Sequence, residues 1–209
     1  MSNIVRIWGP DGPEPLRDET VRVLGGGKLV AFPTDTVYGI GGRYDLPETD
    51  GRLRAAKGSD DKRPFQVLVA DEDAVARFIN EMPPVAAALA EVYWPGPLTI
   101  VMESREGDFV GLRRPDHPVA LFVVRCAGGA LLASSANLSG RPPAKSANEA
   151  VCVFGERVAL AFDGGPPGGG AASSVVKVRQ DGWELLREEA VSCSDLAQAA
   201  DCAPCSLLS

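Results

Sequence analysis

The sequence contains very little histidine and no long apolar run. Its single histidine, His117, excludes a multi-histidine metal site such as His-Glu-x-x-His, and any serine–histidine or cysteine–histidine mechanism would depend on this residue. No stretch of about 18 consecutive apolar residues is present, and the first residues do not open a secretory signal. We therefore expect a cytoplasmic protein with no membrane segment.

Two familiar nucleotide-binding fingerprints are also missing. No Gly-Lys-Ser or Gly-Lys-Thr occurs, which excludes a Walker A phosphate loop, and the dinucleotide pattern Gly-x-Gly-x-x-Gly is absent. The glycine-rich residues 164–170 resemble a mobile flap more than a phosphate cradle. A nucleotide would have to be bound by another design.

The balance of charges is acidic. The 21 basic and 28 acidic residues give a formal net charge of −7, which argues against a protein that grips nucleic acid over its whole surface. Any anion site must therefore be a local group of cations. Five cysteines leave at least one thiol unpaired in a monomer, as is typical of a reduced protein.

The spacing of apolar residues predicts alternating strands and helices. The predicted strands are residues 4–8, 28–32, 65–69, 98–103, 110–113, 130–133, 158–162, 173–179 and 183–187. The predicted helices are residues 18–24, 49–56, 71–79, 83–92, 118–127 and 146–155. Because Asp181-Gly182 also indicates a hairpin, the predicted class is α/β, with a twisted mixed sheet and flanking helices. We expect one domain over residues 1–190 and a loose C-terminal tail over residues 191–209.

Four polar loop segments adjoin the predicted strands, at residues 33–39, 57–64, 112–118 and 133–140. The first places two threonines, an aspartate and a tyrosine after a buried strand, where ligands gather in α/β folds. The second contains three cations that could hold phosphate, and the fourth offers small hydroxyl and amide groups. Each segment could equally be a hydrogen-bonded turn or a solvated loop, and His117 is expected to cap or brace its own turn.

Together and in this order, these segments resemble the YrdC-like family, the threonylcarbamoyl-AMP synthases. The matching strings are FPTDTVYG (32–39), Lys57 with Pro64, WPGPLT (94–99), Arg113 with Pro115 and residues 117–118, SANLSG (135–140), SSVV (173–176) and LR (186–187). The resemblance spans roughly residues 15 to 190. It implies a twisted α/β sheet whose concave face holds a basic cavity.

The resemblance also implies a reaction. Family members condense L-threonine, bicarbonate or CO2, and ATP with Mg²⁺ into threonylcarbamoyl-adenylate, and they release pyrophosphate. A separate transferase complex then converts an adenosine of tRNA to N6-threonylcarbamoyladenosine. Because a carbamate must approach a triphosphate, the site has to neutralise charge and align the attack, which requires cations and neutral donors rather than a covalent nucleophile.

The family pattern assigns roles to individual residues of this chain. The residues expected to be catalytic and to contact ATP are Lys57, Ser135 and Asn137, with Arg63 and Arg187 as further ATP contacts. The residues expected to hold threonine are Thr34, Tyr38, Arg113 and Ser173. The fork of an arginine suits a carboxylate, and no protein-bound metal site is expected.

Two departures from the family pattern stand out. Ser59 occupies the position of an arginine that relatives usually carry, and we hypothesise that Arg63 supplies the missing charge. Glu188-Glu189 follows Arg187 where relatives usually have glycine at the second position. These departures leave an alternative open, a nucleotide- or RNA-binding paralogue without turnover. A second alternative is a relative that handles another carbamoyl-adenylate, as in hydrogenase maturation. A weak contact with tRNA is also considered.

Overall fold

A computed structural model describes residues 3–6, 12–59, 63–180, 182–200 and 206–207. Over these residues the chain forms one mixed sheet of eleven strands in the order β1-β8-β2-β3-β7-β4-β6-β5-β9-β10-β11. The strands are β1 Asn3–Arg6, β2 Leu29–Phe32, β3 Gly39–Arg43, β4 Gln66–Val69, β5 Leu98–Glu103, β6 Phe109–Arg113, β7 Ala130–Ser135, β8 Val158–Asp163, β9 Ser174–Arg179, β10 Gly182–Arg187 and β11 Ser206–Leu207. The predicted mixed α/β class is confirmed.

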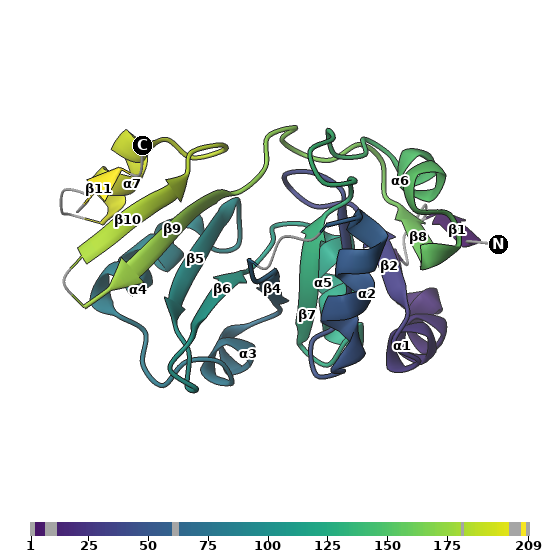
Figure 1. Cartoon of the computed structure of the whole chain (residues 1–209), viewed down its shortest axis with the longest axis horizontal. Helices are drawn as coiled ribbons and strands as arrows, with labels where there is room; N and C mark the ends of the chain where they lie inside the picture. Colours follow the sequence, from purple (N-terminus) through teal and green to yellow (C-terminus); the bar gives the residue numbers. More distant parts are fainter. Residues whose placement is uncertain (1–2, 7–11, 60–62, 181, 201–205, 208–209) are drawn as a thin grey trace.

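Helices flank the sheet (Figure 1). They are α1 Arg17–Gly25, α2 Glu48–Lys57, α3 Glu72–Ala76, α4 Pro84–Tyr93, α5 Pro118–Cys126, α6 Ala147–Phe154 and α7 Cys193–Ala199, with short 3-10 turns at Glu14–Leu16 and Gly155–Arg157. Side-chain caps fix several helix starts, as Asp71 and Ser146 do for α3 and α6. His117 caps α5, because its Nδ1 accepts from the Val119 amide at 3.2 Å. The expected bracing role of His117 is confirmed.

The sheet separates two hydrophobic clusters. The larger cluster contains Leu53 of α2, Leu89 of α4 and Trp183 of β10, all with almost no exposed surface. The smaller cluster contains Phe122 of α5 and Phe162 of β8, whose rings meet edge to face at 6.1 Å. Burial of these faces holds the helices against the sheet and supplies most of the stabilisation.

The sheet consists of two halves joined by a short contact. In the first half, the end of β2, the start of β3 and the end of β7 lie at one edge. In the second half, the start of β5, the end of β6 and the start of β9 share an edge. Between the halves, β4 and β6 pair through only two residue pairs, Val67–Leu112 and Leu68–Arg113. In Figure 1 both edges lie toward the top, and the segment between β8 and β9 runs across them.

Strand β3 was not predicted from the sequence. Its residues, Gly39-Ile40-Gly41-Gly42-Arg43, are mostly glycines, which normally disfavour strands. The structure explains one of them: a Cβ on Gly41 would lie 2.7 Å from the Leu132 carbonyl oxygen of β7. The close approach of β3 to β7 therefore requires glycine at this position.

The structure also differs from the sequence-based expectation at residues 191–200, which were expected to be loose. This segment contains α7, which packs near α4, and its Leu196 is completely buried. The expectation failed because most residues of this segment are small or polar, and the single buried leucine, Leu196, gives no repeating apolar pattern. Helix α3 is also shorter than predicted and ends at Ala76.

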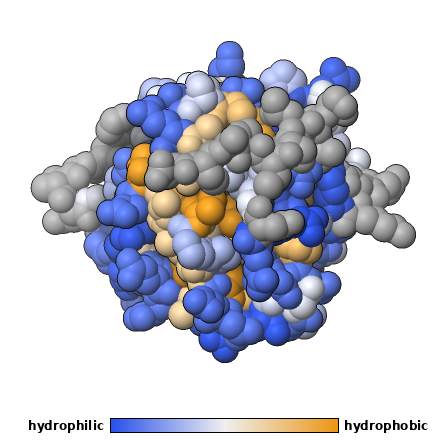
Figure 2. Space-filling view, turned by 90° about the vertical axis from the view of Figure 1, so that its left-hand side faces the viewer, coloured by the Kyte–Doolittle hydropathy of each residue, from blue (hydrophilic) through white to orange (hydrophobic). Residues whose placement is uncertain are grey.

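The face at the β10–β11 end of the molecule carries apolar residues among hydrophilic ones (Figure 2). The exposed hydrophobic residues Val92 of α4 and Leu186 of β10 belong to elements at this end, with 60% and 41% of their surface accessible. Over the described residues, no helix is long and apolar enough to cross a membrane.

Candidate active site

Lys57, Ser135 and Asn137 lie together; we call them the Lys57 group. Lys57 ends α2, and Gly58 stops the helix in the left-handed conformation at φ 58°. The Lys57 side chain is buried, and its Nζ donates to the Ser135 carbonyl at 2.8 Å and the Asn137 carbonyl at 2.9 Å. It also lies 3.3 Å from Asn137 Oδ1. Burial lowers the pKa of Lys57 to about 8.

These contacts fix the conformation of residues 135–139. Ser135 Oγ donates to Asn137 Oδ1 at 2.5 Å, and Asn137 Nδ2 donates to the carbonyls of Leu138 and Arg141. The Ser139 amide in turn donates to the Lys57 carbonyl at 3.0 Å. Lys57 therefore holds a polar turn in place at the end of β7 and also supplies a positive charge there.

Arg113 lies at the end of β6 in a buried polar group that we call the Arg113 group. Its Nε donates to the Gly96 carbonyl at 2.9 Å, Nη1 to Thr36 Oγ1 at 3.0 Å, and Nη2 to Asp35 Oδ1 at 2.7 Å. Only 3% of the Arg113 side chain and 14% of the Asp35 side chain are exposed. Burial lowers the pKa of Arg113, and the Asp35 carboxylate opposes that effect. These contacts use three of the five N–H groups of this arginine, which leaves two for a substrate.

Thr34 and Tyr38 brace this group rather than project freely. Thr34 Oγ1 donates to the Val37 carbonyl at 2.6 Å and lies 2.9 Å from Thr36 Oγ1, so it shapes the turn that presents Thr36 to Arg113. Tyr38 is fully buried, and its hydroxyl donates to the Gly165 carbonyl at 2.8 Å. Burial raises the pKa of Tyr38 to about 12, so the phenol stays protonated as this donor.

The glycine-rich segment after β8 is attached to the same turn. The amide of Gly168 donates to the Thr34 carbonyl at 3.1 Å, and the amide of Gly170 donates to the Thr36 carbonyl at 2.9 Å. A Cβ on Gly168 would approach the Asp35 carbonyl oxygen to 2.9 Å, so the close contact of the two backbones needs glycine. The segment expected to form a flap therefore covers residues 34–36.

Ser173 and Arg187 form the third part of the site. Arg187 Nε and Nη2 donate to the Ser173 carbonyl at 3.0 and 2.7 Å, and Nη2 also contacts Ser173 Oγ at 3.2 Å. A register shift between Leu185 and Arg187 in β10 gives Arg187 its place opposite Val175. Ser173 Oγ lies 3.0 Å from Thr99 Oγ1. Burial lowers the pKa of Arg187, and Glu189, part of the departure from the family pattern, opposes that effect.

The three groups are linked across the two halves of the sheet. Thr36 of the first half bonds Arg113 of the second, and Thr99 Oγ1 of the second half donates to Gln66 Oε1 of the first at 2.8 Å. Their charges also act on each other: Arg187 lowers the pKa of Arg113, although burial is the main cause. The Arg113 group and the Ser173–Arg187 pair thus lie close to each other at the strand ends, and the Ala136 amide beside the Lys57 group donates to the Tyr38 carbonyl at 2.7 Å.

Arg63 is exposed, but its charge reaches this region. Burial is the main cause that lowers the pKa of Arg187, and the positive charge of Arg63 lowers it further. The Arg63 carbonyl accepts from Arg54 Nη2 at 3.2 Å. Residues 60–62, which include two aspartates and a lysine of the same loop, lie outside the described residues.

Sequence reasoning did not select several residues that organise the site. Asp35 and Thr36 stood in a recognised segment but were not assigned roles, although a carboxylate between two threonines beside a strand end is a usable signal. Gln66 gave no signal, because it occupies an ordinary strand position. In the described part of the chain, no three His, Cys, Asp or Glu side chains are grouped to hold a metal ion.

The fold and the site define an α/β protein with a cationic group between two halves of one sheet. Comparison with known proteins gives the family. A family model named Sua5_yciO_yrdC and described as "Telomere recombination" matches residues 22–189. The chain therefore belongs to the Sua5/YciO/YrdC family, and the predicted resemblance is confirmed.

Several relatives carry a functional name. The Threonylcarbamoyl-AMP synthase of Bacillus subtilis (strain 168) is 33% identical over 184 residues, which are 83% of this chain and 53% of that protein. A protein of the same name from Halorhodospira halophila is 33% identical over 159 residues, covering 71% of this chain and 83% of that protein. The chain thus spans about half the length of some relatives, the Bacillus protein among them.

Solved structures show the same fold. The crystal structure of P. abyssi Sua5 complexed with L-threonine matches with a TM-score of 0.89 at 28% identity, covering 100% of this chain and 62% of that chain. The structure of E. coli YciO matches with a TM-score of 0.83 at 20% identity, covering 94% of this chain and 100% of that chain. The expected YrdC-like fold is confirmed.

Proposed function

We propose that this protein is an L-threonylcarbamoyladenylate synthase, a nucleotidyltransferase that makes threonylcarbamoyl-AMP from L-threonine, bicarbonate or CO2, and ATP. The observation that carries the proposal is a cationic region at the strand ends, where Arg113 and Arg187 act on each other, while Lys57 at the end of α2 holds the turn after β7 that adjoins Tyr38. Such a region is suited to two anions that must react with each other. Membership in a family whose members carry this name supports the same conclusion.

The reaction balances without a covalent enzyme intermediate. The threonine amine attacks CO2 and releases one proton to solvent as the carbamate forms, and one carbamate oxygen attacks the α-phosphorus of ATP. The bond from the α-phosphorus to the bridging oxygen breaks, and pyrophosphate leaves. The protein then has two tasks, alignment of the attack and neutralisation of charge on both reactants.

The geometry favours distinct roles for the three groups. The two remaining N–H groups of Arg113 suit the threonine carboxylate, and Thr34, Tyr38 and Ser173 hold the surrounding turns. Lys57 presents a positive charge to the ATP phosphates and holds the turn that contains Ser135 and Asn137. Arg187 and Arg63 extend this positive field.

ATP enters the proposal as its magnesium complex. Mg²⁺ usually keeps several waters and binds nucleotide phosphates directly, with few protein ligands, so it arrives with its substrate. This fits the polar groups of the site, which are cations and neutral donors apart from Asp35, whose carboxylate is already paired with Arg113. The product would pass to a threonylcarbamoyl transferase complex for N6-threonylcarbamoyladenosine formation in tRNA, which needs at most a weak tRNA contact here.

A pyrophosphate-release assay with omitted components tests the proposal. Release should require L-threonine, bicarbonate, Mg²⁺ and ATP together, and Arg113→Lys should lower it by raising the KM for threonine, because lysine lacks the fork. Release with ATP alone, or no release in any mixture, would overturn the proposal in favour of a binding paralogue. RNA retention at moderate salt would support the RNA-binding alternative, which the net charge of −7 disfavours.

We also propose that Arg63 replaces the family arginine missing at Ser59. The effect of its charge on Arg187 supports this role. Arg63→Ala should raise the KM for ATP while leaving the KM for threonine unchanged. Arg105→Ala, on a turn far along the chain, is a control with the same change of charge. Full ATP-dependent activity in Arg63→Ala would exclude the role.

A further inference from the structure

A cavity of about 660 Å³ lies apart from the candidate active site, between α2 and the residues that follow α3. Val67 of β4, Val110 of β6 and Leu132 of β7 line it from three neighbouring strands of the sheet. The described residues that line this cavity do not include any member of the Lys57 group or the Arg113 group. Its volume is in the range of small-ligand sites, roughly 300–1,000 Å³.

Aromatic side chains form much of the wall. They are Tyr44, Phe65, Phe78 and Phe109. Two of these rings already bind cations of the chain itself: the Arg54 guanidinium lies 4.9 Å from the centroid of Phe65, and Lys177 Nζ lies 3.6 Å from that of Phe109. The rings of Tyr44 and Phe78 meet edge to face, with their centroids 4.7 Å apart. Among the described residues, no lysine or arginine forms a cation–π contact with either ring.

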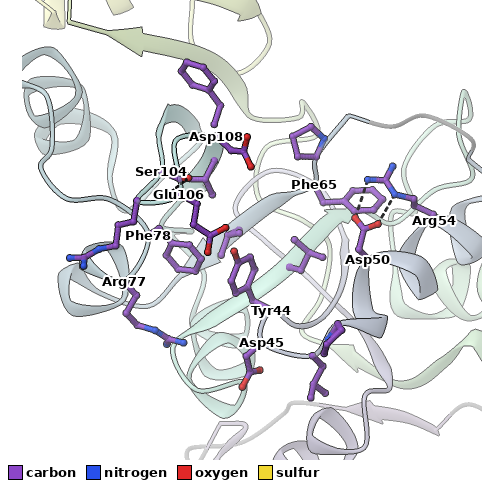
Figure 3. Close-up of a pocket in the computed structure, with 18 residues that line it drawn as sticks. Tyr44, Asp45, Asp50, Arg54, Phe65, Arg77, Phe78, Ser104, Glu106 and Asp108 are labelled. Atoms are coloured by element: carbon purple, nitrogen blue, oxygen red, sulfur yellow. Dashed lines mark hydrogen bonds and ion pairs between the residues drawn. The ribbon is translucent and has the colours of Figure 1, made fainter.

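Two carboxylates stand beside this free pair of rings. Glu106 and Asp108 lie on the turn between β5 and β6, which is closed by the Ser104 amide donating to the Asp108 carbonyl at 2.7 Å. Figure 3 shows the Glu106 carboxylate next to the rings of Phe78 and Tyr44, with Asp108 farther along the same wall. Within the described residues, neither carboxylate forms an ion pair with lysine or arginine.

The other carboxylates of the cavity are already matched. Asp50 accepts from Arg54 at 2.7 and 3.0 Å, and Asp45 accepts from Arg43, which lowers the pKa of Asp45. Two further arginines line the cavity but donate to backbone carbonyls, Arg77 to Gly128 and Arg105 to Ala76 and Ile79. In Figure 3 the Arg77 guanidinium extends away from the space between Glu106 and Phe65. Glu106 and Asp108 are therefore the carboxylates of the described lining that form no ion pair with an arginine.

We propose that this cavity binds an organic cation, an ammonium or guanidinium group at the end of an aliphatic chain. The cation would contact the ring of Tyr44, which is 43% exposed, and pair with Glu106 and Asp108, while its apolar stem lies on the sheet. A free polyamine and a lysine or arginine side chain of another polypeptide share this chemistry. A phosphate or carboxylate would instead meet like charge.

NMR titration of the full chain at 0.15 M salt tests the proposal, with the ring resonances of Tyr44 and Phe78 as the readout. Spermidine represents the free polyamine and Nα-acetyl-arginine amide represents the side chain of a polypeptide. We expect saturable shifts of both rings with at least one probe, and the tighter of the two identifies the source. The neutral analogue 1,6-hexanediol should produce no such shifts.

Variants separate this site from general attraction to an acidic protein. Glu106→Gln with Asp108→Asn should weaken binding at least tenfold, because it removes both carboxylates. Glu19→Gln with Glu91→Gln removes the same charge elsewhere and should leave the affinity unchanged. Tyr44→Leu keeps apolar bulk and should weaken binding about 2- to 5-fold, the loss of one exposed cation–π contact. No saturable shift with either probe, or equal weakening in both double variants, would overturn the proposal.

Discussion

Replacing Asp35 by asparagine should destabilise the protein far more than the same replacement at Asp45. Both carboxylates pair with an arginine at short range, Asp35 with Arg113 at 2.7 Å and Asp45 with Arg43 at 2.5 Å. The pairs differ in burial. The Asp35 and Arg113 side chains are 14% and 3% exposed, whereas those of Asp45 and Arg43 are 45% and 30% exposed.

The expected magnitude follows from this difference. Asp35→Asn leaves the Arg113 charge buried and uncompensated, and breaking a buried pair in this way costs about 3–5 kcal/mol. The residual exposure of Asp35 places the expected loss near the lower end, about 3 kcal/mol, which for a chain of this size lowers Tm by roughly 6–12 °C. Asp45→Asn should cost at most about 1 kcal/mol, because water screens that pair.

Urea unfolding of the wild type and both variants checks this, with the slope m required to stay constant. Asp35→Asn should also raise the KM for threonine, because Arg113 loses the partner that orients its fork. Equal losses of stability in the two variants would refute the reasoning that burial makes the Asp35–Arg113 pair contribute more to stability than the exposed Asp45–Arg43 pair. A normal KM in a destabilised Asp35→Asn would assign Asp35 to folding alone.

Three other predictions concern single side chains. Burial lowers the pKa of Lys57 from 10.5 to about 8, so between these pH values the unfolded chain holds a proton that the folded chain has released. The free energy of unfolding of the wild type, relative to that of Lys57→Met, should therefore rise by up to about 3 kcal/mol as pH increases from 8 to 10.5. A difference between the two proteins that does not change with pH in urea unfolding would contradict the shift. Tyr38→Phe should lower the free energy of unfolding by about 1 kcal/mol and speed amide hydrogen exchange at Gly168 and Gly170. Unchanged exchange would mean that the hydrogen bond from Tyr38 to the Gly165 carbonyl does not hold the glycine-rich segment in place. Leu196→Ala should cost about 2–5 kcal/mol in urea unfolding, while a loss under 0.5 kcal/mol would show that α7 is not part of the core.

The sequence predicted the elements whose apolar residues repeat at a regular spacing. Helices α1, α2, α5 and α6 begin and end close to their predicted bounds, since glycines, prolines and caps mark their ends. Strand β3 was missed because its glycines are required by a long-range contact, the approach of Gly41 to β7, which no local pattern reveals. Helix α7 was missed because one leucine among small residues anchors it.

For the site, the motif order located the residues but not their contacts. Lys57, Ser135 and Asn137 are neighbours, yet the sequence did not reveal that Lys57 binds the backbone carbonyls of the other two. Asp35 and Gln66 acquire their importance only from partners that lie more than 30 residues away along the chain. Such partners depend on the strand order of the sheet, which periodicity cannot supply.

The two residue pairs between β4 and β6 have a consequence for how substrates would influence each other. Because so few backbone bonds join the halves, their relative orientation also depends on side-chain ties, which are those of Arg113 to Asp35 and Thr36 and that of Thr99 to Gln66. A molecule that touches both halves adds another tie and reduces their independent motion. The first substrate to bind then lowers the entropic cost of ordering the site for the second, so ATP and threonine should each increase the affinity for the other by the same factor.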